Sequence, residues 1–151
     1  MNNTPLDLRE FLPYRLSVLT NKVSRALAGL YSSRFGLSVT EWRVMAVLGQ
    51  QPGLSADAVC ARTEMDKVGV SRAVARLLEK GWLARDFAPT DRRRSVLRLT
   101  PRGRSVYRRI TPLARAFHAR LISALDEREQ KQLMQLLDRL DAQAAGLAEP
   151  E

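Results

Sequence analysis

The chain has 151 residues, a formal net charge of +9 and a pI near 10.7, which together predict one basic folding unit. One cysteine and one histidine exclude a disulfide framework and a metal site built from the protein ligands of one chain, so we expect no metal and no cofactor. No apolar run is long enough to span a bilayer and no signal peptide is visible. The expected location is the cytoplasm, with no membrane partner.

The excess of positive charge is confined to the central third of the chain. Residues 62–109 contain 14 basic and five acidic residues, whereas the rest of the chain is electrically balanced. A phosphate-binding surface requires such a concentration of charge. A merely solvated arginine-rich face is the alternative. A membrane-surface helix would need a long amphipathic stretch with bulky aromatic side chains opposite the charges, and this segment has no such stretch. The charge therefore favours nucleic acid as the partner.

Apolar spacing predicts two helices before the basic segment. Residues 12–34 place leucine, valine and alanine on one helical face, and Gly36 suits a C-terminal cap. A second helix is expected after Ser38, whose hydroxyl can accept from the backbone of Glu41. The Glu41 carboxylate is expected to reach back to Ser38 and complete a capping box.

A helix-turn-helix is predicted at residues 55–80. Ser55 is expected to cap the short first helix and Asp66 the second, and Gly81 ends the second helix. The inner face of the second helix is formed by Val70, Ala73, Val74, Leu77 and Leu78. Its basic side chains then lie outward, where they fit the major groove of B-DNA.

A two-stranded wing is predicted at residues 82–99, with strands at 82–87 and 95–99. The loop between them carries Arg92, Arg93 and Arg94, which can reach the minor groove. Arg85 and Arg98 are expected to face each other across the ribbon. The fold class is therefore mainly α with a small β-wing, a winged helix-turn-helix.

Two further helices are predicted after the wing. Thr100-Pro101 begins a long helix that we expect to bend at Pro112. Asp126 and Glu129 form a capping box at the start of the last helix. That helix carries a stripe of leucines, which are Leu133, Leu136, Leu137, Leu140 and Leu147.

Several of these motifs resemble the MarR family of bacterial transcriptional regulators. They are Leu54-Ser55, Asp66-Lys67-x-x-Val70-Ser71-Arg72-x-Val74-x-Arg76-Leu77, Gly81-x-Leu83-x-Arg85, Asp91-x-Arg93 and Leu99-Thr100-x-x-Gly103. The resemblance covers nearly the whole chain. It implies a homodimer on a pseudo-palindromic operator in double-stranded DNA, with dimerisation helices at 11–36 and 101–148 and a DNA-binding lobe at 38–100.

The resemblance also implies roles for single residues. It assigns DNA contacts to Ser55, Lys67, Ser71, Arg72, Arg76, Asp91, Arg92 and Arg93, with Asp91 holding the minor-groove side chain of Arg93. The alternative for Asp91 is ordinary turn chemistry. Gly69 stands where relatives often carry Ser or Thr, and Glu64 stands where a Gly is common. At Gly69, either the backbone approaches DNA closely or that contact is absent.

A repressor released by a small aromatic or phenolic acid, or by its coenzyme A thioester, is the function that the resemblance implies. Side chains suited to such an anion are Tyr14, Arg15, Trp42, Arg43 and His118. Tyr14 and Trp42 also fit as core aromatics, and Arg15 and Arg43 as salt-bridge partners in a dimer. The resemblance also suggests a peroxide-sensing role for Cys60, but the relatives that sense oxidants use a cysteine in the first helix, so we favour a small core residue.

Two other classes of function compete with a regulator. An enzyme is not expected, because the sequence contains no nucleophile–base motif, no phosphate-binding glycine loop and no paired carboxylates. An architectural protein that binds DNA without sequence preference would explain the charge but not the capped second helix at residues 66–80. The sequence therefore favours a regulator that reads sequence.

Overall fold

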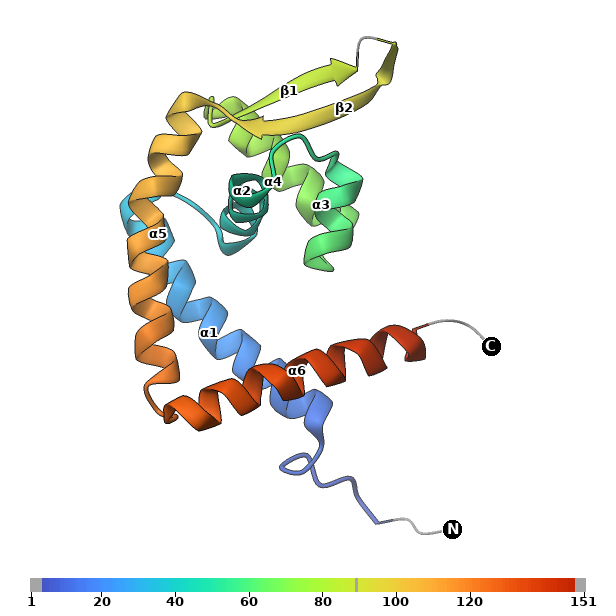
Figure 1. Ribbon diagram of the computed structural model, residues 1–151, viewed down its shortest axis with the longest axis vertical. Coiled ribbons are helices and arrows are strands. Elements are labelled where there is room, and N and C mark those ends of the chain that lie inside the picture. Colours follow the sequence, from blue (N-terminus) through green and yellow to red (C-terminus); the bar gives the residue numbers. More distant parts are fainter. Residues whose placement is uncertain (1–3, 89, 149–151) are drawn as a thin grey trace. The chain divides into compact units, whose positions relative to one another are not determined.

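The computed structural model describes residues 4–88 and 90–148, and the side chains of Ala88, Arg92 and Arg93 lie outside the described part. The described residues are mostly helical, with one two-stranded antiparallel sheet (Figure 1). This confirms the predicted fold class. The elements are α1 (Leu12–Phe35), α2 (Val39–Gln50), α3 (Ala56–Thr63), α4 (Lys67–Glu79), β1 (Leu83–Ala88), β2 (Asp91–Leu99), α5 (Pro101–Ile122) and α6 (Glu127–Leu147).

The chain divides into two compact units, Met1–Thr111 and Pro112–Glu151. The first contains α1 to α4, the wing and the first half of α5, and the second contains the rest of α5 and α6. The boundary falls at Pro112, inside α5, where we expected a bend. The bend stays a prediction, as does the functional division into dimerisation helices and a DNA-binding lobe.

One apolar core organises the first unit. Every element of this unit contributes to it, and the largest fully buried side chains are Tyr31, Leu37, Val44, Met45, Leu48, Val59, Val70, Val74, Leu77, Leu97 and Ile110. Cys60 is half-buried and packs against this core, as predicted for a small core residue. The core joins α2, α3 and α4 to the wing, which lie together in Figure 1.

Local capping signals set the helix boundaries. Gly36 has φ +62° after α1, as a left-handed C-cap requires. Ser38 accepts a hydrogen bond from the Glu41 amide at 3.1 Å, but the expected return contact of the Glu41 carboxylate is wrong. That carboxylate turns into the protein and bonds Lys80 instead. The capping box at Asp126 and Glu129 is complete in both directions.

The wing is longer than the sequence predicted. Strand β2 begins at Asp91, so the expected loop at residues 88–94 is mostly strand, with a register shift between Phe87 and Ala88. The alternation of apolar and polar residues that marks a half-buried strand is missing in this stretch, because a projecting ribbon need not bury either face. The expected pairing of Arg85 with Arg98 is also wrong. Arg98 lies opposite Ala84, and Arg85 lies opposite Leu97.

The wing is fastened to the first turn of α5 by a compact set of hydrogen bonds. The Thr100 hydroxyl donates to the Gly81 carbonyl at 2.7 Å and accepts from the Gly103 amide at 3.0 Å. The Thr100 amide donates to the Trp82 carbonyl at 3.0 Å. A side chain at position 103 would overlap that same carbonyl oxygen, so only glycine fits. We call Gly81, Trp82, Thr100 and Gly103 the wing junction.

Candidate nucleic-acid interface

Helix α4 presents a basic face because its other face is fixed in the core. Val70, Ala73, Val74 and Leu77 are all buried, and this sets the rotation of the helix about its axis. The predicted contact residues Lys67, Ser71, Arg72 and Arg76 are consequently exposed. The structure thus brings these four side chains together on one solvent-facing surface, as a recognition helix requires.

The first turn of α4 is held by Asp66. Its carboxylate accepts a hydrogen bond from the Gly69 amide at 2.6 Å, which confirms the predicted cap. A Cβ at position 69 would lie only 3.2 Å from the Asp66 carboxylate oxygen. The missing side chain at Gly69 therefore leaves room for the Asp66 cap.

Helix α3 begins against the wing. Ser55 accepts from the Ala58 amide at 3.1 Å, and this leaves its own hydroxyl proton available to a phosphate oxygen. The Leu97 amide donates to the Leu54 carbonyl at 2.8 Å, so the residue before the cap is paired with β2. A groove of about 610 Å³ separates the start of α3 from Arg94, Ser95 and Val96. The backbone amides of α3 and the cation of Arg94 thus border one concave surface.

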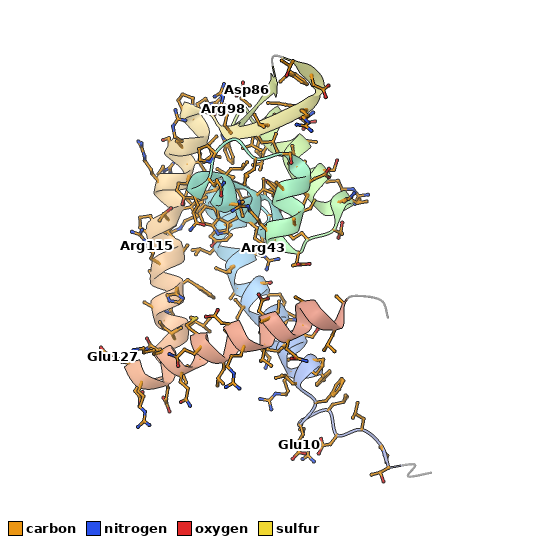
Figure 2. All side chains as sticks on the ribbon, turned by 45° about the vertical axis from the view of Figure 1, so that its right-hand side comes forward. Glu10, Arg43, Asp86, Arg98, Arg115 and Glu127 are labelled. Carbon is orange, nitrogen blue, oxygen red and sulfur yellow. The ribbon has the colours of Figure 1, made fainter. Side chains whose placement is uncertain are left out.

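The wing carries charge along its length. Asp86 and Arg98 form an ion pair at 2.6 Å on adjacent strands (Figure 2). Asp91 is the first residue of β2 and pairs with Ala88 in the sheet. Because the side chains of Arg92 and Arg93 lie outside the described part, the expected contact between Asp91 and Arg93 stays a prediction.

A buried carboxylate that the sequence did not reveal joins α2 to α4. The Glu41 side chain is only 4% exposed, lies 2.9 Å from the Lys80 ammonium nitrogen and 3.7 Å from the nearest Arg76 nitrogen. Lys80 also donates to the Gly36 carbonyl at 2.8 Å and lies 5.0 Å from the centre of the Trp82 ring. Lys80, at the end of α4, thus contacts Gly36 in the turn before α2, Glu41 on α2 and Trp82 at the start of the wing.

The five predicted effector residues are distributed over three helices. Trp42 is half-buried between Tyr31 and Tyr107, with ring centroids 5.4 and 5.7 Å away, so it is a core-edge aromatic. Burial raises the pKa of Tyr31. Tyr14 is 45% exposed, so the core alternative for it is wrong within one chain.

One chain does not bring Tyr14 and Trp42 together. Tyr14 lies 17 residues before Tyr31 on α1, or about 25 Å along the helix axis, and Tyr31 is the residue that contacts Trp42. Arg15 is exposed and donates to the Arg9 carbonyl at 2.9 Å, and Arg43 and His118 are exposed on α2 and α5. The proposed effector contacts of these residues are untested by this arrangement.

Neither a metal centre nor a membrane span is found in the described residues. No cluster of histidine, cysteine, aspartate and glutamate within residues 4–88 and 90–148 has the arrangement to hold a metal ion. Across the same residues, no helix combines the length and apolar character needed to cross a membrane.

Two helices joined by a short turn that ends in a helix cap, followed by a two-stranded wing, define a winged helix-turn-helix protein. The family model described as the MarR family matches residues 35–94. The HTH-type transcriptional regulator BilQ of Clostridium symbiosum is 30% identical over 105 residues, which cover 70% of this chain and 73% of that protein. The HTH-type transcriptional repressor Rv2887 of Mycobacterium tuberculosis is 29% identical, over 86% of this chain and 91% of that protein.

Solved structures agree with these sequence relatives. A MarR/EmrR family regulator from Acinetobacter sp. ADP1 has a TM-score of 0.88 at 26% identity, covering 93% of this chain and 99% of that one. The PcaV regulator from Streptomyces coelicolor, solved with its natural ligand, has a TM-score of 0.76 at 26% identity over the same shares of the two chains. The chain belongs to the MarR family of transcriptional regulators. These proteins are regulators and not enzymes.

Proposed function

We propose that this regulator is a homodimeric repressor that binds a pseudo-palindromic operator in double-stranded DNA. The observation that carries the proposal is the setting of α4, whose four buried apolar residues leave Lys67, Ser71, Arg72 and Arg76 exposed. Helix α4 then enters the major groove, and Arg92 and Arg93 of the wing enter the minor groove beside it. Ser55 contacts phosphate from the start of α3, and Asp91 holds Arg93. Such a regulator acts on DNA in the cytoplasm.

Repression is supported by the Mycobacterium tuberculosis relative Rv2887, which is a transcriptional repressor. A repressor competes with polymerase for its operator, so it must discriminate that site from the rest of the genome. Sequence-independent architectural binding remains the second candidate.

Footprinting on the promoter region beside the chain's own gene separates the two. One protected inverted repeat, with half-sites about 10 bp apart, supports a repressor. Uniform protection of the fragment supports the architectural alternative. In both cases the affinity should fall log-linearly with salt, because the basic surface releases counterions on binding.

The dimer is supported by apolar side chains that one chain leaves in solvent. Helix α6 has no buried residue, and the exposed large apolar side chains gather at its leucine stripe and at the start of the chain. They are Leu6, Leu8, Phe11, Leu12, Tyr14, Leu16 and Leu19, and Leu133, Met134, Leu136, Leu137, Leu140 and Leu147. Exposed apolar surface on this scale marks an interface.

Sedimentation equilibrium tests the dimer directly. Leu137→Asp should shift the protein toward monomer, because it places a charge within the stripe. Gln135→Asp, at an exposed polar position of the same helix, is the matched control and should leave the dimer intact. A wild-type protein that stays monomeric and still binds its operator fully would contradict the proposed dimer.

A small aromatic acid, or its coenzyme A thioester, is proposed to release the repressor from DNA. The PcaV relative was solved with its natural ligand, so a protein of this fold can hold a small molecule. The candidate contacts are the adjacent Trp42 and Arg43 on α2, together with Tyr14, Arg15 and His118, which lie elsewhere in the chain. These residue types offer the aromatic surface and cations that such an anion needs. Titrating 4-hydroxybenzoate and benzoyl-coenzyme A into the DNA complex tests this. Arg43→Gln should weaken release without changing DNA affinity in the absence of the anion.

A further inference from the structure

Val68 is an apolar side chain at the exposed start of α4. It is 60% exposed and follows Lys67 on the helix that we propose to bind DNA. Among the described residues of segment 38–100, Val68 and Phe87 are the only large apolar residues with exposed side chains. The other exposed large apolar side chains of the described chain lie at residues 6–19 and 121–147, where we place the dimer interface.

The rotation of α4 leaves no core position for Val68. Val70, Ala73, Val74 and Leu77 define the buried face, and Val68, Arg72 and Arg76 follow one another at four-residue spacing on an exposed face. The Asp66 cap fixes the backbone of this first turn through the Gly69 amide. The cap therefore fixes the backbone that carries Val68, although the Val68 side chain does not pack inside the protein.

Valine is also a poor choice for this position on stability grounds. Its branched Cβ restricts the side chain in a helix, and alanine or lysine would form the first turn more readily. A single exposed apolar residue is common on protein surfaces and by itself proves nothing. The position of this one decides what it can contact, because the first turn of a recognition helix lies closest to the base edges.

The major groove offers one apolar group, the C5-methyl of thymine. We propose that Val68 packs against a thymine methyl in each operator half-site and so helps to determine sequence specificity. The proposal rests on the proposed binding of α4 in the major groove. Arg72, one helical turn further along, reaches a polar base edge or a phosphate and supplies the charged part of the contact.

Uracil substitution tests this contact with a change of one methyl group. A duplex is first selected from a random-sequence pool by the purified full-length protein. Each thymine of that duplex is then replaced singly by deoxyuridine, which keeps the base pair and removes the methyl. For wild-type protein we expect one thymine in each half-site at which uracil weakens binding about fourfold, as expected for one buried methyl. Uracil at both positions should weaken it about 15-fold.

The Val68→Ala variant lacks the contact in both half-sites, so it should bind the thymine duplex about 15-fold more weakly than wild type. Uracil at the two thymine positions should then cause no further loss of affinity. Val68→Thr, which keeps one methyl on the branched Cβ, is the matched control and should retain part of the discrimination. Because the side chain is exposed, both variants should unfold at the wild-type urea midpoint or above it.

Two results would overturn the inference. One is a wild-type protein that tolerates uracil at every thymine, and the other is a Val68→Ala variant that remains sensitive to uracil. A pool from which no sequence is enriched is a different result, because it contradicts sequence-specific binding and hence the proposed function itself.

Discussion

Removing the Glu41 carboxylate should destabilise the first unit, because it leaves Lys80 without its charged partner. In Glu41→Ala, the Lys80 ammonium keeps only the Gly36 carbonyl as a hydrogen-bond acceptor. Breaking a fully buried ion pair on one side costs about 3–5 kcal/mol, whereas a surface pair contributes about 0–1 kcal/mol. The Lys80 side chain is 31% exposed and Arg76 is 64% exposed, so most of the effect falls on Lys80. We expect a loss of about 2 kcal/mol.

Urea unfolding followed by circular dichroism measures this loss. All proteins are compared at one protomer concentration, because dimer formation makes stability concentration-dependent. The corresponding fall in Tm is about 4–8 °C. Lys80→Ala and the double variant complete a cycle in which the two losses should not add. Glu79→Ala, which removes an exposed carboxylate one residue before Lys80, is the matched control and should cost a few tenths of a kcal/mol.

DNA binding gives an independent reading of the same network. In Glu41→Gln, Arg76 loses the carboxylate 3.7 Å away, which competes with phosphate for its guanidinium group. Affinity for random duplex should rise, and the slope of log affinity against log salt should steepen by about one. The reasoning is refuted if Glu41→Ala costs no more stability than Glu79→Ala and the salt slope of Glu41→Gln is unchanged.

Three other predictions follow from single positions. Asp91→Ala and Arg93→Ala should each weaken operator binding, and the two losses should not add if Asp91 acts through Arg93; strictly additive losses in a titrated double-mutant cycle would refute that role. Glu64→Gly should raise the free energy of unfolding by about 0.5–1 kcal/mol, because Glu64 has the left-handed φ of +53° that glycine accepts without strain, and a lower urea midpoint would contradict this. Gly103→Ala should lower the free energy of unfolding by about 2–3 kcal/mol, because the new Cβ would overlap the Trp82 carbonyl oxygen. Gly29→Ala has nothing within 4 Å of its Cβ position and should raise the free energy of unfolding by about 0.5–1 kcal/mol; equal effects in thermal unfolding would refute the overlap.

The sequence predicted the elements whose signals are local. Ser38, Ser55 and Asp66 each cap the helix that follows them, and the inner face of α4 is written in its own apolar spacing. Glycine is common at the position of Glu64, and the backbone there has the left-handed conformation that glycine favours. Such features depend on a few neighbouring residues, so a single sequence contains them.

The sequence did not show features that depend on distant partners. Glu41 and Lys80 are 39 residues apart, and nothing in the neighbourhood of Glu41 distinguishes a capping carboxylate from a buried ion-pair partner. The start of β2 at Asp91 depends on pairing with β1, which outweighs the loop-like composition of Arg92 and Arg93. The close approach of the Asp66 carboxylate to position 69, which leaves little room for a side chain there, is likewise a property of three-dimensional geometry.

Because the wing junction fastens the base of the wing to the first turn of α5, a rotation of that turn moves the whole wing with it. Strand β2 has nine residues and is therefore about 30 Å long, while its base is held by Thr100 and by a glycine that admits no side chain. A tilt of about 10° at that base would displace the tip by roughly 5 Å, which is close to the 6 Å width of the minor groove. If the wing arginines bind the minor groove as we propose, a rotation of α5 too small to disturb the core would be enough to release them.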